Sequence, residues 1–185
     1  MLEEIISGAK IDMDKAIDAL KKALATIRTG RAQTSLLDSV RVDYYGALSP
    51  LSQISNITIP DSNMLVVKPW DKNMLKPIEK AIQEANLGLN ASTDGDMIRV
   101  PVPSLTGERR KEFVRQAKQR SEDAKVAVRN ARRDANEMLK DATKDGTIAE
   151  DDEKQGLKQV QETTDLFIRE IDKMLEHKEA EIMTV

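Results

Sequence analysis

The residues of this sequence with the clearest chemical potential are three arginines. Arg129, Arg132 and Arg133 lie close together in the stretch VAVRNARRDANEML, within what reads as a long helix. A guanidinium group is a planar fork of N–H donors that binds phosphate through paired, charged hydrogen bonds. At the i±3 and i±4 positions of a helix, Arg129 and Arg132 have no carboxylate, whereas Arg133 has Glu137. The pattern favours contact with phosphate, with Arg133 shared between that partner and Glu137.

The three arginines belong to a larger cationic segment. Residues 109–133 hold ten Lys and Arg side chains against three Asp and Glu, although the chain has a formal net charge of -3. At about 100° per residue, seven of these cations share a sector of about 100° beside the apolar seam of the helix. The seven are Lys111, Arg115, Lys118, Lys125, Arg129, Arg132 and Arg133. An alternative interpretation pairs them with carboxylates of the same helix or of the acidic segment 146–185.

Catalysis finds little support in the residue types. The chain has no cysteine and one histidine, His177, which excludes disulfides, a thiolate nucleophile and a histidine-rich metal site. No glycine-rich phosphate loop is present, and the acids at 150–153 suit the dipole at a helix start. We therefore expect no catalytic residue, no metal and no cofactor. The carboxylates that an enzyme in the middle segment could use are scattered: Asp71, Glu79, Glu84 and Asp94.

The chain has no apolar run near the roughly 20 residues that span a bilayer, and its N-terminus carries acids early. We expect a cytoplasmic protein with no membrane partner. Phe113 and Phe167 fall at apolar seams, which leaves no stacking platform for single-stranded nucleic acid on the helices. A helix laid along structured RNA or DNA is favoured instead. Tyr44, Tyr45 and Trp70 are interpreted as core or contact residues.

Three long helices must position the cations. Apolar residues with 3,4 spacing predict helices over 2–28, 106–145 and 146–185. The short KDGT turn makes the last two antiparallel, so an elongated three-helix bundle would bury the three seams. The first helix is expected to end near Gly30. The seam of the second comprises Val114, Ala117, Ser121, Ala124, Val128, Ala131, Ala135, Met138 and Ala142.

Apolar residues in the middle of the chain are spaced differently. Alternating or β-branched stretches predict strands within 39–46, 54–61, 64–70 and 98–102, and a helix runs from Pro77 to Gly88. The fold class is therefore α+β, with a bundle of residues 1–30 and 105–185 and an inserted β/α/β domain of residues 31–104. Two linkers side by side predict a hinge. Its residues are Thr29, Gly30, Arg31, Pro103, Ser104, Leu105, Thr106 and Gly107.

A set of motifs in a fixed order resembles the ribosome recycling factors over essentially the whole chain. The motifs are IRTGRA, SLLD, YYG, PWDKNMLKPIEKAI, LGLN, IRVPVPSLT, ERRKE, VRNARRDAN and EDD. The resemblance implies an L-shaped, transfer-RNA-like molecule. It also implies a factor that binds the ribosome after termination through large-subunit ribosomal RNA and acts with elongation factor G to split the subunits. The GTP is hydrolysed by elongation factor G, and the inserted domain would face that factor and the small subunit.

The resemblance also implies which residues contact ribosomal RNA. The matching arginines are Arg129, Arg132 and Arg133 in VRNARRDAN, together with Arg28, Arg31, Arg109 and Arg110 near the hinge. Lys118 and Lys125 join them as members of the cationic sector, and the protein is expected to be a monomer. A different class of function stays open from the residues alone, namely a coiled-coil scaffold whose basic helix pairs with an acidic protein surface.

Overall fold

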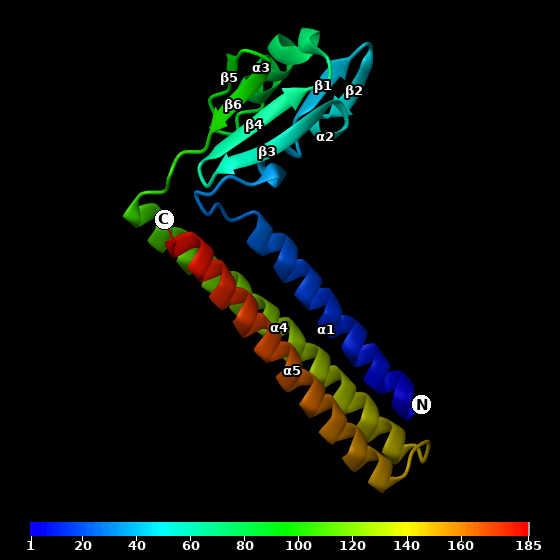
Figure 1. Cartoon of the computed structure of the whole chain (residues 1–185). Coiled ribbons are helices and arrows are strands. Elements are labelled where there is room, and N and C mark those ends of the chain that lie inside the picture. Colours follow the sequence, from blue (N-terminus) through cyan, green and yellow to red (C-terminus); the bar gives the residue numbers. More distant parts are fainter. Residues whose placement is uncertain (185) are drawn as a thin grey trace. The chain divides into compact units, whose positions relative to one another are not determined.

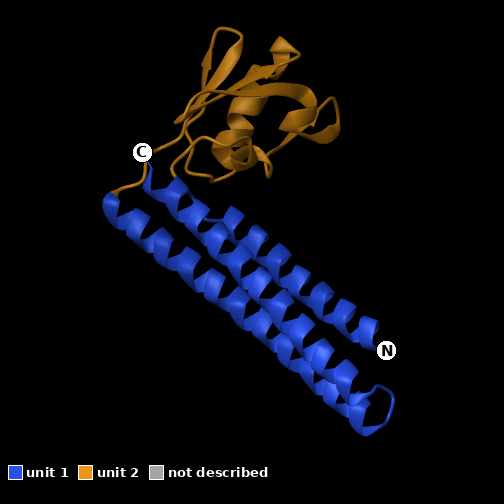
Figure 2. Ribbon diagram, turned by 60° about the horizontal axis from the view of Figure 1, so that its bottom comes forward, with its two compact units in different colours: residues 1–29, 107–184 blue, residues 30–106, 185 orange. Residues whose placement is uncertain are grey.

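The computed structural model describes residues 1–184 and divides them into two compact units (Figures 1 and 2). Unit 1 contains residues 1–29 and 107–184, and unit 2 contains residues 30–106. The sequence placed these breaks at 30/31 and 104/105, one and two residues away. The fold is α+β, as predicted, with the long helices in unit 1 and a small antiparallel sheet in unit 2.

Unit 1 is a bundle of three long helices. They are α1 (Leu2–Ala25), α4 (Gly107–Lys144) and α5 (Glu150–Met183), and α4 runs opposite to the other two (Figure 2). The turn between α4 and α5 closes through Gly146, whose φ is +70°, and the Thr147 amide donates to the Ala142 carbonyl at 2.8 Å. A side chain at residue 146 would be strained at this angle, so glycine fits the turn.

Helix α1 is shorter than predicted. It ends at Ala25, where the Thr26 hydroxyl donates to the Ala23 carbonyl at 2.7 Å. A hydroxyl that bonds the backbone in this way competes with continuation of the helix. Gly30 was expected to close the helix, but it lies five residues further on, in the linker of unit 2, with φ of +73°.

Small residues of α4 form the middle of the bundle core. Ala117, Ser121, Ala124, Ala131 and Ala135 are buried, so large side chains of α1 and α5 can approach closely. The predicted seam was wrong at Met138, which is 57% exposed, while Leu139 is fully buried. A straight helix drifts by about 20° per heptad from a strict seven-residue repeat, which moves the last seam position on by one residue. The buried residues that fill the space opposite are Met13, Ile17, Leu20, Phe167, Ile171 and Ile182.

Side chains of α1 and α4 pack directly against Gly156 of α5. A Cβ atom at this position would lie 2.8 Å from Leu2 Cδ1 and 2.9 Å from Leu139 Cδ2. Real Cβ atoms are not found at such distances, so Leu2 and Leu139 occupy the volume that a side chain at 156 would need. Glycine lowers the helix propensity of α5 here but permits the contact.

Unit 2 is built on a four-stranded antiparallel sheet with the strand order β3-β4-β6-β5 and a separate β1-β2 hairpin (Figure 1). Buried Leu65, Val67, Ile98 and Val100 of the sheet share one core with α3. Each predicted strand and the predicted helix is present, whereas β2, β5 and α2 were not anticipated. The elements are β1 (Arg41–Tyr44), β2 (Ala47–Pro50), α2 (Leu51–Ile54), β3 (Ser55–Asp61), β4 (Met64–Pro69), α3 (Leu75–Glu84), β5 (Ser92–Asp94) and β6 (Met97–Pro101), with 3-10 turns at Thr34–Leu37 and Lys72–Met74.

Candidate nucleic-acid interface

Helix α4 presents its cations in two rows. The inner row borders α5 and consists of Lys118, Lys125 and Arg132, which follow one another at intervals of seven residues. The outer row lies one step further from the core and consists of Arg115, Arg129 and Arg133. The sequence placed all six in one sector, but it did not separate the two rows.

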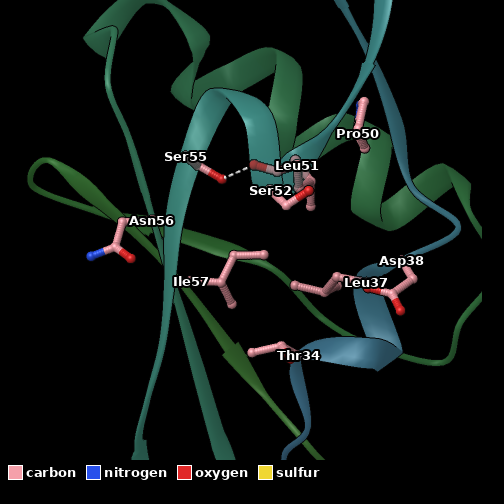
Figure 3. Close-up of a pocket in the computed structure, with 9 residues that line it drawn as sticks. All are labelled: Thr34, Leu37, Asp38, Pro50, Leu51, Ser52, Ser55, Asn56 and Ile57. Atoms are coloured by element: carbon pink, nitrogen blue, oxygen red, sulfur yellow. Dashed lines mark hydrogen bonds between the residues drawn. The ribbon is translucent and has the colours of Figure 1, made fainter.

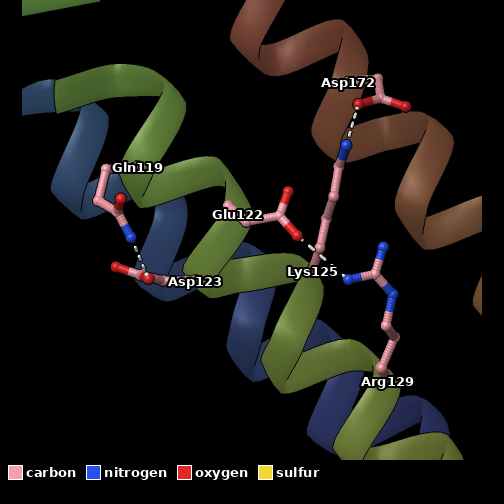
Figure 4. Close-up of polar contacts among 6 residues, drawn as sticks. All are labelled: Gln119, Glu122, Asp123, Lys125, Arg129 and Asp172. Atoms are coloured by element: carbon pink, nitrogen blue, oxygen red, sulfur yellow. Dashed lines mark hydrogen bonds and ion pairs between the residues drawn. The ribbon is translucent and has the colours of Figure 1, made fainter. Parts of the chain in front are cut away.

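The inner row pairs with the acidic helix α5. Lys118 Nζ lies 3.6 Å from Glu179 Oε1. Figure 4 shows the second pair, in which Lys125 Nζ lies 2.6 Å from Asp172 Oδ1. Only 18% of the Lys125 side chain is exposed, so its methylenes are part of the packed surface between the helices. For these two lysines, the alternative interpretation of interhelical pairing describes the structure.

Arg132 also reaches α5, but it meets an amide rather than a carboxylate. Its Nη1 donates to Gln161 Oε1 at 3.2 Å, and Gln161 Nε2 donates to Asp165 Oδ1 at 2.8 Å. The side chain is half-buried. As predicted, no carboxylate of its own helix pairs with Arg132 within residues 1–184. The inner-row arginine therefore keeps its charge uncompensated by any direct ion pair.

The outer row differs from the prediction at two positions. Arg129 was expected to lack a carboxylate on its own helix, but its Nη1 lies 3.2 Å from Glu122 Oε1 (Figure 4). A neighbour search limited to i±3 and i±4 misses this pair, because two extended side chains bridge two helical turns. Arg133 was expected to meet Glu137, yet no ion pair joins them in the described part of the chain, and the Arg133 side chain is exposed.

The outer row can nevertheless exchange its partners for phosphate at little cost. Side-chain exposure is 42% for Arg129 and 55% for Glu122, and exposed pairs of this kind contribute about 0–1 kcal/mol. Bidentate arginine–phosphate contacts are stronger and release counterions from the nucleic acid. Arg115 and Arg133 have no hydrogen-bond or ion-pair partner among residues 1–184 that would have to be displaced. The surface is thus suited to an anionic partner.

The remaining predicted contact residues lie near the ends of the units. Arg28 and Arg109 are exposed, and Arg109 Nη1 lies 3.1 Å from Glu112 Oε2. Arg110 in α4 and Arg31 in unit 2 are half-buried, and each has a buried Nε without a hydrogen-bond partner. Arg31 belongs to a different unit from the other basic residues, so the structure of unit 1 does not bring it to the α4 surface.

The two linkers are held together inside unit 2. A Cβ atom at Gly30 would lie 3.1 Å from the Leu105 backbone nitrogen, so the first linker lies against the second. The turn between β3 and β4 binds both linkers, because Ala32 N donates to Ser62 O at 2.6 Å and Val102 N donates to Asn63 O at 2.8 Å. Residues 30–106 belong to unit 2, which places Thr29 and Gly107 immediately outside it. The predicted strands 54–61 and 64–70 imply this turn, but its bonds to the two linkers were not anticipated.

Two aromatic side chains of unit 2 are exposed rather than in its core. Tyr45 is 74% exposed and Trp70 is 69% exposed, while Tyr44 is half-buried. The Tyr45 hydroxyl donates to Asp71 Oδ2 at 2.5 Å, and Asp71 Oδ1 accepts from the Asn73 amide at 2.9 Å. The bond to the Asp71 carboxylate raises the pKa of Tyr45. The same bond, followed by that from Asn73, lowers the pKa of Asp71. This pair fixes the tip of the β1-β2 hairpin.

A cavity of unit 2 contains no catalytic constellation in its lining. It encloses about 500 Å³ between the turn at 34–37 and strand β3, and the Ser55 hydroxyl on its wall donates to the Leu51 carbonyl at 2.5 Å (Figure 3). Asp38 is the one titratable side chain of its lining. Acid–base catalysis would need two groups with different pKa values, which this lining does not provide. The lining comprises Thr34, Leu37, Asp38, Pro50, Leu51, Ser52, Ser55, Asn56 and Ile57.

Residues 1–184 offer neither a metal site nor a membrane-spanning helix. No group of three or more His, Cys, Asp or Glu side chains there could hold a metal ion. None of the helices in the same range combines the length and apolar character that crossing a membrane requires. His177 is largely exposed, with Nδ1 3.2 Å from Glu181 Oε1 on the next turn of α5.

Fold and surface together define a class of two-unit protein, a three-helix bundle with a cationic face and an inserted α+β domain. A family model described as "Ribosome recycling factor" matches residues 20–183 of this chain. Curated relatives called ribosome-recycling factor include those of Ralstonia pickettii (strain 12J), 56% identical, and Burkholderia cenocepacia (strain HI2424), 54% identical; in both alignments 98% of each chain is covered. The chain belongs to the ribosome recycling factor family.

Solved structures agree with this assignment. A solution structure of the ribosome recycling factor is 44% identical, with a TM-score of 0.79 over 100% of this chain and 98% of that one. Another structure describes the T. thermophilus ribosome recycling factor and the E. coli elongation factor G bound to the E. coli post-termination complex. Its matching chain is also 44% identical, with a TM-score of 0.67 and complete coverage of both chains.

Proposed function

We propose that this protein binds the post-termination ribosome and, together with elongation factor G and GTP, promotes its separation into subunits. The observation that carries the proposal is the relative from T. thermophilus, which matches this chain over its whole length and is described with elongation factor G on a post-termination complex. The protein acts without a catalytic site or cofactor of its own, and elongation factor G hydrolyses the GTP.

The bundle binds the large subunit through the surface of α4. Arg129, Arg132 and Arg133 contact ribosomal RNA phosphates, because their guanidinium groups are exposed or half-buried and carry at most weak partners. Lys118 and Lys125 add positive potential while they pair with α5. Arg28, Arg31, Arg109 and Arg110 extend the contact near the linkers.

The inserted domain transmits force from the GTPase. Unit 2 faces elongation factor G and the small subunit. It moves about Thr29 and Gly107, which flank the two linkers that are hydrogen-bonded to the β3–β4 turn. A bundle fixed to the large subunit would convert this movement into strain on the contacts between subunits. The two linkers run together, so the domain rotates without separating from the bundle.

Sedimentation with purified large subunits tests the RNA-binding part of this proposal. The protein is expected to pellet with the subunits, and Arg132→Ala to weaken binding by about tenfold, the factor that corresponds to about 1.4 kcal/mol. Lys158→Ala is the matched control, since it removes one exposed cation from α5 rather than from α4. A protein that stays in the supernatant would favour a coiled-coil scaffold, and equal losses in the two variants would count against a specific role of Arg132.

A further inference from the structure

The contact between Arg132 and Gln161 differs from those of the other inner-row residues, Lys118 and Lys125, which form ion pairs with carboxylates of α5. Along α4 each step of seven residues toward the C-terminus matches a step of seven toward the N-terminus of α5, so Lys118 meets Glu179 and Lys125 meets Asp172. The same step brings Arg132 opposite Asp165. An ion pair between these two residues would complete the row.

No ion pair joins Arg132 and Asp165 in the part of the chain that the structure describes. The amide of Gln161 lies between them, because its oxygen accepts from Arg132 Nη1 at 3.2 Å and its nitrogen donates to Asp165 Oδ1 at 2.8 Å. Gln161 and Asp165 are one helical turn apart on α5, which suits this bond. The amide thereby occupies the carboxylate that the arginine would otherwise approach.

A neutral amide and a carboxylate have different effects on a guanidinium. A carboxylate can accept two parallel N–H bonds and cancels the charge, whereas the amide oxygen accepts from one of the five N–H groups. Arg132 is therefore oriented by Gln161, keeps its full charge and forms no second hydrogen bond within residues 1–184 that an anion would have to displace. A fixed rotamer also loses less conformational entropy on binding.

We propose that Gln161 is a positioning residue for Arg132, which holds the guanidinium at the α4 surface and shields it from Asp165 so that it can bind a ribosomal RNA phosphate. The inference rests on the proposed function. It assigns Gln161, a neutral residue of the acidic helix α5, an indirect role in binding. Gln161 itself does not contact the RNA phosphate.

Gln161→Glu tests the proposal, since it replaces the amide by a carboxylate of nearly the same shape next to Arg132. Binding to purified large subunits is expected to weaken about fivefold, the factor that corresponds to an exposed ion pair of about 1 kcal/mol. The slope of log affinity against log salt is expected to fall by about 0.7–0.9, the value for one lost phosphate contact. The melting temperature of the variant should change little, because the new ion pair with Arg132 offsets the lost bond to Asp165 and the repulsion between the two carboxylates.

Gln119→Glu is the matched control. Gln119 of α4 also donates to an aspartate four residues further on, Asp123, at 2.9 Å (Figure 4), and within residues 1–184 it forms no hydrogen bond with an arginine. The control adds the same charge to the same kind of pair, one turn from Arg115, so it should weaken binding less than Gln161→Glu does. Equal weakening by Gln119→Glu and Gln161→Glu would show a general charge effect and would overturn the proposal.

A double-mutant cycle with Arg132→Ala separates this inference from the proposed function. Gln161→Glu should have no more effect than Gln119→Glu once Arg132 is absent, since its action passes through that arginine. If Arg132→Ala leaves affinity unchanged, the proposed function of Arg132 fails, and the positioning role fails with it. If Arg132→Ala weakens binding but Gln161→Glu does not, the positioning role alone is wrong.

Discussion

Lys125 and Arg133 lie eight residues apart on α4, yet the structure gives them opposite roles. Lys125 is 18% exposed and lies 2.6 Å from Asp172, whereas Arg133 is exposed and has no partner within residues 1–184. We expect Lys125→Ala to lower the stability of the bundle with little loss of ribosome binding. Arg133→Ala should weaken ribosome binding and leave stability unchanged.

The magnitudes follow from burial. Lys125→Ala removes about three methylenes, mostly buried, and one ion pair; at about 0.8 kcal/mol per buried methylene and at most about 1 kcal/mol for the pair, the loss is roughly 2–3 kcal/mol. For a chain of this length the melting temperature should fall by roughly 4–12 °C. Arg133→Ala should change stability by less than about 0.5 kcal/mol and weaken binding to large subunits about tenfold.

Thermal unfolding followed by circular dichroism, combined with sedimentation, measures both effects. Lys125→Met is the control, because it retains the packed methylenes and removes only the charge, so most of the lost stability should return. The reasoning would be refuted if Lys125→Ala melted like the unmodified protein and lost as much ribosome affinity as Arg133→Ala.

Three further predictions concern the two units. Ser121→Ala should raise the free energy of unfolding by about 1 kcal/mol in urea denaturation, because the Ser121 hydroxyl is buried without a partner; a loss of stability would imply a bond to that hydroxyl. Gly8→Ala should stabilise α1 by about 0.5–1 kcal/mol, since that site is open, whereas Gly156→Ala should lose this gain to steric overlap of about 1–3 kcal/mol; equal stabilities would contradict the packing described. The Tyr45–Asp71 bond should weaken at both pH extremes. At low pH it is lost as the pH falls below the ordinary pKa of Asp71 and through its lowered pKa. At high pH it is lost as the pH rises above the ordinary pKa of Tyr45 and through its raised pKa. Absorbance titration should therefore find a lower Tyr45 pKa in Asp71→Asn, and an unchanged pKa would exclude the bond.

Much of the fold is predictable from the sequence because hydrophobic spacing reports burial directly. The 3,4 pattern located α4 and α5, and alternating or β-branched stretches located the strands of the four-stranded sheet except β5. The end of α1 was missed because the helix ends at Ala25, with no glycine to mark that position. The short strands β2 and β5 were missed because their residues are exposed or half-buried, which leaves no alternation to detect.

The candidate site could be located from the sequence, but its internal pairing could not. Charge counting found the cationic face of α4, since it needs only the order of residues. The partner of Arg132 depends on the register between α4 and α5, and the partner of Arg129 depends on side chains extended over two turns. Glu122 and Gln161 were therefore missed. Matching the α4 and α5 heptads across the KDGT turn is the signal that could have pointed to α5 around Gln161.

Separation of post-termination ribosomes into subunits is the activity on which the proposed function depends. Purified 70S post-termination complexes can be followed by light scattering after addition of this protein, elongation factor G and GTP. We expect scattering to fall only in the complete mixture, and to fall more slowly at limiting concentrations of the Arg132→Ala variant. Unchanged scattering in the complete mixture, with a folded protein that binds the ribosome, would contradict the proposed function.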